Sequence, residues 1–402
     1  MEREIITWIY AVECSSTYFI NLRRTNLSDS REASISDLDL LISFLSPEVR
    51  KVFERIFKVN VVTGCLDHPE AMHPWLEKQF GSIEGITCQK IIKVTNQITM
   101  EGALFNELRA SRPIEHKVRM DMEALIIDEQ KNDPLNDPLR YTPADLFGRA
   151  IGRFSVSGSN VAKYDSLHAI IVFDHHNPLH FDRERIVDYF NTGWRWAQKA
   201  HEHDPSAKYY FFIWNCLWKA GASLNHGHAQ VMLTRDMHYA KIENLRRMAL
   251  TYRQQYGSNY FHDLFQVHES LGCGVAKDGI KVLAYITPIK DKEVIIIGDA
   301  LNLTFEEKVY EVLACFRDQL GVTSFNLALI MPPIAPVEEN WEGFPVLVRI
   351  VDRGDPQTNA SDIGTMELYA ANVISSDPFK VARELKVALF ASPEPVAETS
   401  QT

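Results

Sequence analysis

The chain has 402 residues, of which 46% are hydrophobic and 24% are charged, and its formal net charge at pH 7 is −11. This length is sufficient for two or three domains with a sizeable core. The negative charge argues against a protein that binds nucleic acid or anionic membranes, so an anionic substrate would need a local cluster of arginine and lysine.

Cysteine usage and the start of the chain bear on its location. The six cysteines, at positions 14, 65, 88, 216, 273 and 315, do not follow the spacing of a disulfide framework. In a chain of this length we expect them to be reduced thiols of a cytoplasmic protein. The first four residues, Met-Glu-Arg-Glu, do not resemble a signal peptide, and no apolar run is long enough to span a membrane.

Residues 1–95 are expected to form an accessory region. Apolar residues at helical spacing predict an amphipathic helix over 49–59. Cys65, His68 and His73 lie close together in the sequence, and such residues can bind zinc. No partner pair is evident, however, and the Asp-His-Pro and Met-His-Pro contexts favour turns.

Two arginines precede Pro113. Arg109 and Arg112 are three residues apart, and guanidinium groups at this spacing can form a fork for phosphate or sugar hydroxyls. The alternative is a solvated basic pair. The segment 125–128 reads as a strand, which would follow this element directly.

Residues 143–215 alternate between helical and extended patterns. The predicted elements are a short helix over 143–149, a strand over 166–173, a helix over 182–200 and an aromatic strand over 209–215. Asn160 precedes the first of these strands, His168 lies on it, and Asn215 ends the second.

The most informative stretch contains His226-Gly-His228-Ala-Gln230. Polar residues alternate with small ones, which is typical of a strand and would turn both histidines and the glutamine to one face. The preceding loop, Lys219–Ser223, consists mostly of small residues, so its backbone N–H groups could approach an anion closely. This arrangement suits a phosphorus centre, although a His-x-His pair can also be structural or bind a metal.

The motif resembles that of the histidine-triad superfamily, in the transferase branch that holds galactose-1-phosphate uridylyltransferase and diadenosine tetraphosphate phosphorylase. The resemblance covers residues 100–235. It implies that His228 is the nucleophile and that Gln230 and Ser223 hold the phosphate. His226 would support the catalytic strand.

The same resemblance implies roles for residues outside the motif. Asn160 and Asn215 match asparagines that lie near the nucleotide and the nucleophile. Arg109 and Arg112 match an Arg-x-x-Arg-Pro element beside the nucleotide site.

The chain departs from the family at a metal site. Many uridylyltransferases carry a Cys-x-x-Cys pair after the Arg-Pro element, and it binds a structural metal together with two histidines, one of them the first histidine of the motif. Here the corresponding segment begins Asp133-Pro-Leu-Asn, and no cysteine occurs between Cys88 and Cys216. We therefore expect no cofactor and no structural zinc on His226.

Residues 241–391 are expected to form a second, degenerate half without a triad, and residues 392–402 a flexible tail. The pattern predicts a hairpin around Asp278-Gly279 and a helix over 304–320 that starts at a Thr304 cap. Charged residues in this half could contact a second substrate, although exposed positions without a role are the simpler alternative. These residues are Glu269, Arg349, Arg353 and Glu367.

The expected fold is α+β, a histidine-triad-like half-barrel of mostly antiparallel strands with helices, duplicated in the second half. Residues 96–240 would be the catalytic half. The expected function is a nucleotidyltransferase that forms a covalent nucleotidyl-histidine and acts on a nucleoside diphosphate sugar and a sugar 1-phosphate. Alternatives are a dinucleoside polyphosphate phosphorylase and a non-catalytic nucleotide-binding protein. The expected partners are nucleotide substrates and a second copy in a homodimer, but neither nucleic acid nor membrane.

Overall fold

The computed structural model describes residues 32–81, 83–110, 126, 133–358 and 361–390. Contacts divide the chain into two units, Met1–Ala33 and Ser34–Thr402, and the following description concerns the second. The predicted tail, Arg112 and nearly all of the predicted strand 125–128 lie outside the described residues. Within these ranges, no helix is both long and apolar enough to cross a membrane.

The first described elements are short helices that lead into a strand. They are η1 (Ile35–Asp37), α1 (Leu38–Ser43) and α2 (Pro47–Ile56). The hydroxyl of Ser46 caps α2 by accepting from the Val49 N–H group, and the helix buries Phe53 and Ile56. The predicted helix over 49–59 is therefore too long, because the β-branched residues after Ile56 pair as strand β1 (Phe57–Cys65).

A four-stranded sheet has the order β1-β2-β3-β13. It combines β2 (Cys88–Asn96) and β3 (Gly102–Phe105) with β13 (Asn372–Ile374), which runs parallel to β3. The expected boundary after residue 95 thus falls inside β2, and a strand from the C-terminal part completes this sheet. The connection between β1 and β2 contains three short helices: η2 (Glu70–Met72), α3 (His73–Phe80) and α4 (Glu84–Thr87).

Two cysteines form a disulfide at the end of the β1–β2 ladder. Cys65 lies directly opposite Cys88 in the register, with a Cα–Cα distance of 4.1 Å. The expectation of reduced thiols is wrong for this pair, because strand pairing brings together two residues that no short spacing connects. Cys216, Cys273 and Cys315 are free and buried.

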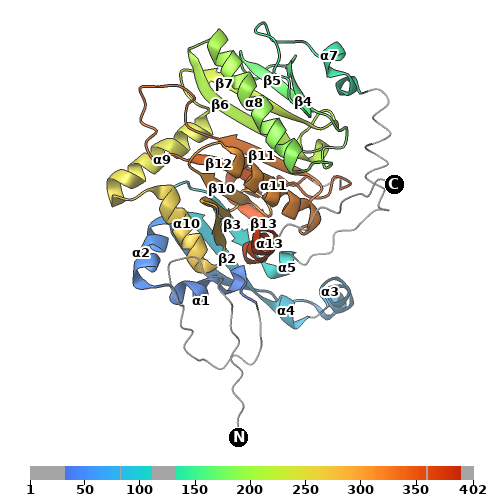
Figure 1. The fold of residues 1–402 in the computed structure, drawn as a ribbon. Coiled ribbons are helices and arrows are strands. Elements are labelled where there is room, and N and C mark those ends of the chain that lie inside the picture. The colour runs from blue at the N-terminus through green and yellow to red at the C-terminus, as the bar shows by residue number, and fades with distance from the viewer. Residues whose placement is uncertain (1–31, 82, 111–125, 127–132, 359–360, 391–402) are drawn as a thin grey trace, which may run out of the picture. The chain divides into compact units, whose positions relative to one another are not determined.

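The other sheet has nine strands in the order β4-β5-β7-β6-β11-β12-β10-β9-β8, and all neighbours are antiparallel (Figure 1). Pairing of β6 with β11 joins the two expected halves into one continuous sheet. The strands are β4 (Ser155–Ser159), β5 (His168–Phe173), β6 (Ala207–Asn215), β7 (His228–Arg235), β8 (Gly274–Lys277), β9 (Ile280–Ala284), β10 (Val294–Gly298), β11 (Phe325–Ile330) and β12 (Val346–Asp352).

Long helices pack against this sheet. Helix α8 (Arg183–His203) packs on β4 to β7, while α11 (Leu303–Asp318) packs on α8, β9 and β10. The side chain of Asn302 caps α11 by accepting from the Phe305 N–H group, so the helix starts one residue before the predicted Thr304 cap. The other helices are α5 (Glu107–Ala110), η4 (Pro134–Asn136), α7 (Pro138–Tyr141), η5 (Trp218–Ala220), α9 (Ala240–Tyr256), α10 (Tyr260–Leu271), α12 (Thr365–Tyr369) and α13 (Pro378–Phe390).

Two predictions of local structure have opposite outcomes. The Asp278-Gly279 hairpin is confirmed, with φ values of 54° and 79° at its two turn residues. The predicted helix over 143–149 is wrong, because Asp145 bridges to Gly148 in a tight turn in which Gly148 has φ of 86°. The α+β class is confirmed, while the half-barrel and the duplication remain predictions.

Buried polar contacts connect the four-stranded sheet to the nine-stranded part. The amide of Asn96, at the end of β2, donates to the hydroxyl groups of Tyr260 and Tyr285, both at 2.8 Å. Nearby, Arg349 on β12 donates to Glu101 at 2.8 Å and to Glu293 at 2.6 Å. Arg349, proposed as a substrate contact, is therefore engaged in an internal ion-pair network.

Candidate active site

One face of the nine-stranded sheet carries a row of half-buried residues between fully buried neighbours. In the register, Ile170 of β5 lies opposite Gln230 of β7, and Gln230 lies opposite Ile213 of β6. Ile213 is opposite Ala328 of β11, which is opposite Arg349 of β12. Strand alternation places these side chains on one face. Because this face is less covered than the other, it is the candidate substrate surface.

His228 is the first residue of β7 and is 8% exposed. Its Nδ1 atom lies 2.8 Å from the carbonyl oxygen of His226. A carbonyl only accepts, so Nδ1 carries the proton and the unprotonated Nε2 holds a lone pair. Burial lowers the pKa of His228 below its ordinary value. The side chain is therefore a neutral imidazole with one nitrogen available as a nucleophile.

Gln230 is oriented by His168, its diagonal neighbour on β5. The Tyr164 N–H group donates to Nδ1 of His168 at 2.9 Å, so the proton of this ring resides on Nε2. Nε2 donates in turn to Oε1 of Gln230 at 3.0 Å. The amide NH₂ group of Gln230 is thereby left to donate elsewhere. Asn160 also lies here, with its Nδ2 atom 3.2 Å from Nε2 of His168.

The segment between β6 and β7 contains two residues with a left-handed backbone. Leu217 and Gly221, on either side of η5, have φ values of 68° and 94°. Ser223 follows and is exposed. Asn215, at the end of β6, pairs with Asn326 of β11. Ile213 of β6 lies opposite Gln230 of β7, so extending this antiparallel register by two residues places Asn215 opposite His228. The structure thus brings His228, Gln230 and Asn215 to one face of the sheet.

The side chain of His226 does not continue the alternation of β7. His226 precedes the strand, its Nε2 atom lies 3.0 Å from the Phe173 carbonyl oxygen, and its Nδ1 atom contacts Asp133. The prediction that 226, 228 and 230 share one strand face therefore holds only for 228 and 230. Instead, His226 contacts the ring of His228 through its carbonyl group.

Asp133, His176 and His226 form a buried cluster whose potential ligand atoms all lie within 4.8 Å of one another. Nδ1 of His176 is 2.8 Å from Oδ2 of Asp133, the same oxygen that His226 contacts. Nε2 of His176 is 2.8 Å from the Ile126 carbonyl oxygen. Both rings thus carry a proton on Nε2, and in the neutral form both Nδ1 lone pairs face the carboxylate.

Three acceptor atoms, Oδ2 of Asp133 and Nδ1 of both histidines, converge in this buried cluster. A proton or a cation between them would offset their mutual repulsion. The donor set of one carboxylate oxygen and two imidazole nitrogens fits a divalent cation. It has one ligand fewer than a structural zinc site. The expectation of no zinc depends on the missing cysteines, whereas the cluster uses Asp133, the first residue of the segment in which the resemblance would place them.

The arginine pair is only partly described. Arg109 is exposed in α5, directly after β3 of the four-stranded sheet. Among the described residues, no hydrogen bond or ion pair joins it to His228, and Arg112 lies outside the described residues. Their role in nucleotide binding remains a prediction.

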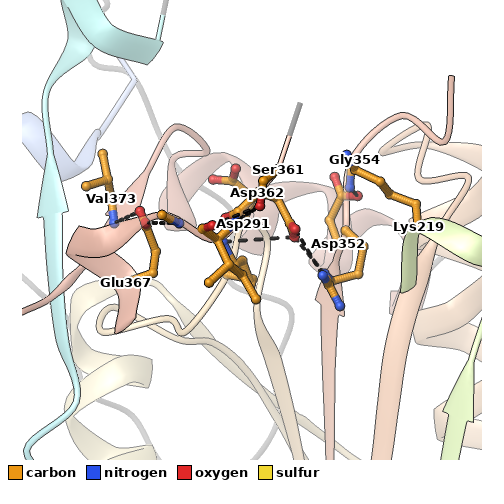
Figure 2. Close-up of polar contacts among 12 residues, drawn as sticks. Lys219, Asp291, Asp352, Gly354, Ser361, Asp362, Glu367 and Val373 are labelled. Carbon is orange, nitrogen blue, oxygen red and sulfur yellow. Dashed lines mark hydrogen bonds and ion pairs between the residues drawn. The ribbon is translucent and has the colours of Figure 1, made fainter. Parts of the chain in front are cut away.

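Two other charged residues of the second half have internal partners. Arg353 forms a paired contact with Asp362 at 2.7 and 3.0 Å. Glu367 accepts from the N–H groups of Gly364, at 2.8 Å, and Val373, at 3.4 Å, at the start of α12 (Figure 2). Glu367 is therefore a helix cap rather than a free ligand, and the role of Glu269 stays a prediction.

Three site residues were not identified as such from the sequence: His168, Asp133 and Asn326. His168 was noted on its strand, but its link to Gln230 depends on the β5–β7 register. Asp133 has a signal in the sequence, because it begins the segment in which the resemblance would place the metal-binding cysteines. Asn326 carried none, since only the pairing of β11 with β6 brings it to the site.

No model of a known protein family matches the chain, and no curated protein matches it. Solved structures do. An ADP-glucose phosphorylase from Arabidopsis thaliana with bound ADP-glucose matches with a TM-score of 0.55 at 14% identity, over 74% of this chain and 98% of that one. A uridylyltransferase matches with a TM-score of 0.51 at 14% identity, also over 74% and 98%.

The chain has the uridylyltransferase fold. A GalT-like protein from Arabidopsis thaliana shares it, with a TM-score of 0.52 at 15% identity over 64% of this chain and 92% of that one. The resemblance that His226-Gly-His228-Ala-Gln230 indicated is thus confirmed at the level of the fold.

Proposed function

We propose that this uridylyltransferase-fold protein is a nucleotidyltransferase that works through a covalent nucleotidyl-histidine on His228. The observation that supports this most is the tautomer of His228, because the His226 carbonyl group leaves the Nε2 lone pair unprotonated. The amides of Gln230 and Asn215 lie on the same sheet face. A nucleophile beside amide donors suits attack on a phosphorus atom.

In the first half-reaction, Nε2 of His228 attacks the α-phosphorus of a nucleoside diphosphate sugar. The new N–P bond forms as the bond from this phosphorus to the bridging oxygen breaks, and the sugar 1-phosphate leaves with that electron pair. Charge on the non-bridging oxygens is held by the Gln230 NH₂ group, by Asn215 and by N–H groups of the Lys219–Ser223 loop. Arg109 and Arg112 would add positive charge.

In the second half-reaction, a phosphate oxygen of the acceptor attacks the same phosphorus from the side that the first product left. The N–P bond breaks and the lone pair returns to Nε2. Gln230 cannot transfer a proton as a third histidine could, so a phosphate, which needs no protonation to leave, is the appropriate leaving group.

Asp133, His176 and His226 would hold a divalent cation if one is bound. Such an ion would supply structural charge neutralisation at the start of β7, and no chemical step uses it. The expectation that no structural zinc is bound through His226 remains a proposal, and it depends on the lack of a cysteine between Cys88 and Cys216 in the sequence. The cluster's own task is to hold the His226 backbone, whose carbonyl group selects the tautomer of His228.

The acceptor separates the two best candidates. A sugar 1-phosphate acceptor makes the protein a uridylyltransferase-type enzyme, whereas inorganic phosphate makes it a phosphorylase. The structural similarity to an ADP-glucose phosphorylase supports the phosphorylase as the second candidate. We also propose a cytoplasmic location, a role in carbohydrate metabolism, a homodimer and a degenerate second half.

The test is adduct formation without acceptor. The protein is incubated with a panel of nucleoside diphosphate sugars and dinucleoside polyphosphates, and its intact mass is measured. We expect a mass increase of one nucleotidyl group, which is a nucleoside monophosphate less one water. The adduct should be labile in acid and stable in alkali, because protonation makes the ring nitrogen a leaving group. His228→Ala should abolish the adduct and turnover, and His262→Ala, whose ring is largely exposed, should change neither.

Adding sugar 1-phosphate or inorganic phosphate to the isolated adduct then identifies the acceptor. Turnover by a wild-type protein that never forms the adduct would contradict the covalent mechanism. Full activity of His228→Ala would contradict it as well. Absence of both adduct and turnover with every donor would favour a non-catalytic nucleotide-binding protein.

A further inference from the structure

Asn326 of β11 has all its amide hydrogen-bonding groups engaged, and the partners leave one orientation. Its Oδ1 atom accepts from Arg353 at 2.6 Å, and a guanidinium group can only donate. Its Nδ2 atom donates to the Ala220 carbonyl oxygen at 2.8 Å, and a carbonyl can only accept. The same Nδ2 atom donates to Oδ1 of Asn215 at 2.7 Å. The amide of Asn326 cannot be reversed without losing these contacts.

This orientation determines that of Asn215. Because Oδ1 of Asn215 accepts from Asn326, the NH₂ group of Asn215 is the part that remains to act as a donor. Asn215 lies at the position opposite His228 when the β6–β7 register is extended, and both side chains belong to the same sheet face. The donor is therefore directed to the face where the proposed reaction places the phosphoryl oxygens.

Asn326 also holds the backbone of η5, in the segment between β6 and β7. The Ala220 carbonyl group belongs to η5, and the segment after β12 makes two hydrogen bonds with the same turn. The indole N–H of Trp218 donates to the Pro356 carbonyl oxygen at 2.9 Å, and Nζ of Lys219 donates to that of Thr358 at 3.2 Å. Three separate contacts from the second half thus hold η5 in place.

Arg353 is itself held by the loop that it begins. Its guanidinium group is paired with Asp362, and Lys290 contacts the same residue. Asp352, just before Arg353, accepts from the Gly354 N–H group at 2.7 Å. Figure 2 shows Asp352, Gly354 and Asp362 together with Lys219 of η5. One NH group of Arg353 donates to Asn326. The side-chain amide of Asn326 therefore connects this ion-pair network to the sheet face that carries Asn215 and His228.

We propose that Asn326, held by Arg353, is a positioning residue for the proposed nucleotidyl transfer. It directs the Asn215 NH₂ group toward the phosphorus that His228 attacks, and it holds η5 through Ala220. The second half of the sheet, which has no triad, thereby orders the site of the first half. This inference rests on the proposed function.

The decisive variant is Asn326→Asp, which keeps size and the contact with Arg353 but replaces the donor by an acceptor. The new carboxylate oxygen would face the Ala220 carbonyl oxygen and Oδ1 of Asn215, which are both acceptors. The Asn215 amide would then reverse to donate its NH₂ group to the carboxylate, and its oxygen would face the phosphoryl group. We expect the single-turnover rate of adduct formation and kcat to fall by about 10- to 100-fold, the loss typical of one donor to a charged transition state. KM for the donor should change by less than about threefold, because the interaction develops in the transition state.

Asn372→Asp is the matched control, since the amide of Asn372 also donates to a backbone carbonyl oxygen, that of Gly102 at 3.2 Å, but in the four-stranded sheet. Its adduct rate should equal that of the wild type. Arg353→Lys, which cannot keep the paired contact with Asp362, should lower the adduct rate less than Asn326→Asp does. Thermal unfolding of every variant separates misfolding from a catalytic effect.

The outcomes distinguish the two proposals. If the wild type forms the adduct and folded Asn326→Asp forms it equally fast, the positioning role is wrong and the proposed function stands. A loss only in KM would likewise contradict the positioning role. If the wild type forms no adduct with any donor, the proposed function fails, and the positioning role fails with it. If Asn326→Asp does not fold, Arg353→Lys provides the test. A folded Arg353→Lys variant with the wild-type adduct rate would show that the positioning role is wrong.

Discussion

His168 offers the sharpest test of how the site is built, because it touches no substrate in the proposed reaction. The perturbation is His168→Phe. The side chain is fully buried and stacks on Tyr164 with 4.8 Å between ring centroids, and phenylalanine can keep this packing. Two hydrogen bonds are lost, the one from the Tyr164 N–H group at 2.9 Å and the one to Gln230 at 3.0 Å.

The expected magnitudes follow from these two bonds. Loss of both, with a partly buried N–H group left without its acceptor, should lower the free energy of unfolding by about 1–3 kcal/mol. Without His168, the Gln230 amide is free to reverse and present its oxygen to the phosphoryl group. A hydrogen bond to a charged group contributes about 1.5–3 kcal/mol, so kcat should fall by about 10- to 150-fold.

The assay is a double-mutant cycle on the rate of adduct formation, with His168→Phe, Gln230→Ala and the double variant. Because His168 acts through Gln230, the double variant should be no slower than Gln230→Ala alone. His268→Phe is the matched control: this ring is also fully buried, stacks on Tyr285 and has backbone partners at both nitrogens. It should lose stability and keep its adduct rate. Additive losses in the double variant would refute the reasoning.

Three further predictions concern stability and binding. Burial raises the pKa of Glu306 to about 7, so the folded state holds this proton more tightly than the unfolded chain does, and the free energy of unfolding should fall as pH rises from about 4.5 to 7. In chemical denaturation at pH 8, Glu306→Gln should be more stable than the wild type by about 2–3 kcal/mol. If the variant and the wild type show the same pH profile, this prediction is wrong. Asp133→Ala leaves two buried imidazoles without their shared carboxylate, so the free energy of unfolding should fall by about 3–5 kcal/mol, and a wild-type denaturation midpoint would count against the cluster. Arg109→Ala and Arg112→Ala should each weaken nucleotide binding by about 1–3 kcal/mol in titration calorimetry, and unchanged affinity in both would remove the pair from the site.

The sequence by itself determined features that depend on neighbouring residues. The Asp278-Gly279 hairpin forms because Gly279 adopts a positive φ without strain and Asp278 tolerates one. Helix α8 starts where Asp182 can cap it, with its side chain accepting from the Arg185 N–H group at 2.9 Å. The aromatic run that ends at Asn215 forms a buried strand. The alternation around His228 predicted the strand and the family resemblance, which the fold confirms.

Tertiary structure decided what depends on pairing between distant segments. Cys65 and Cys88 meet through the β1–β2 register, and Asn326 meets Asn215 because β11 pairs with β6 across 111 residues. Local propensity carries no information on such registers, since they are set by which hydrophobic faces can be buried together.

The same limit explains the errors at single residues. Residue Phe57 fits the helical apolar face of the preceding residues, yet pairing with Asn96 makes it the first residue of β1. His226 fits the strand alternation, yet its ring turns to Asp133, which lies 93 residues earlier in the chain. In both cases a contact with a distant segment outweighs a weak local preference, because burial and hydrogen bonding contribute more than propensity does. The sequence thus determined the strand that carries His228, and the packed structure decided the partners that orient this side chain.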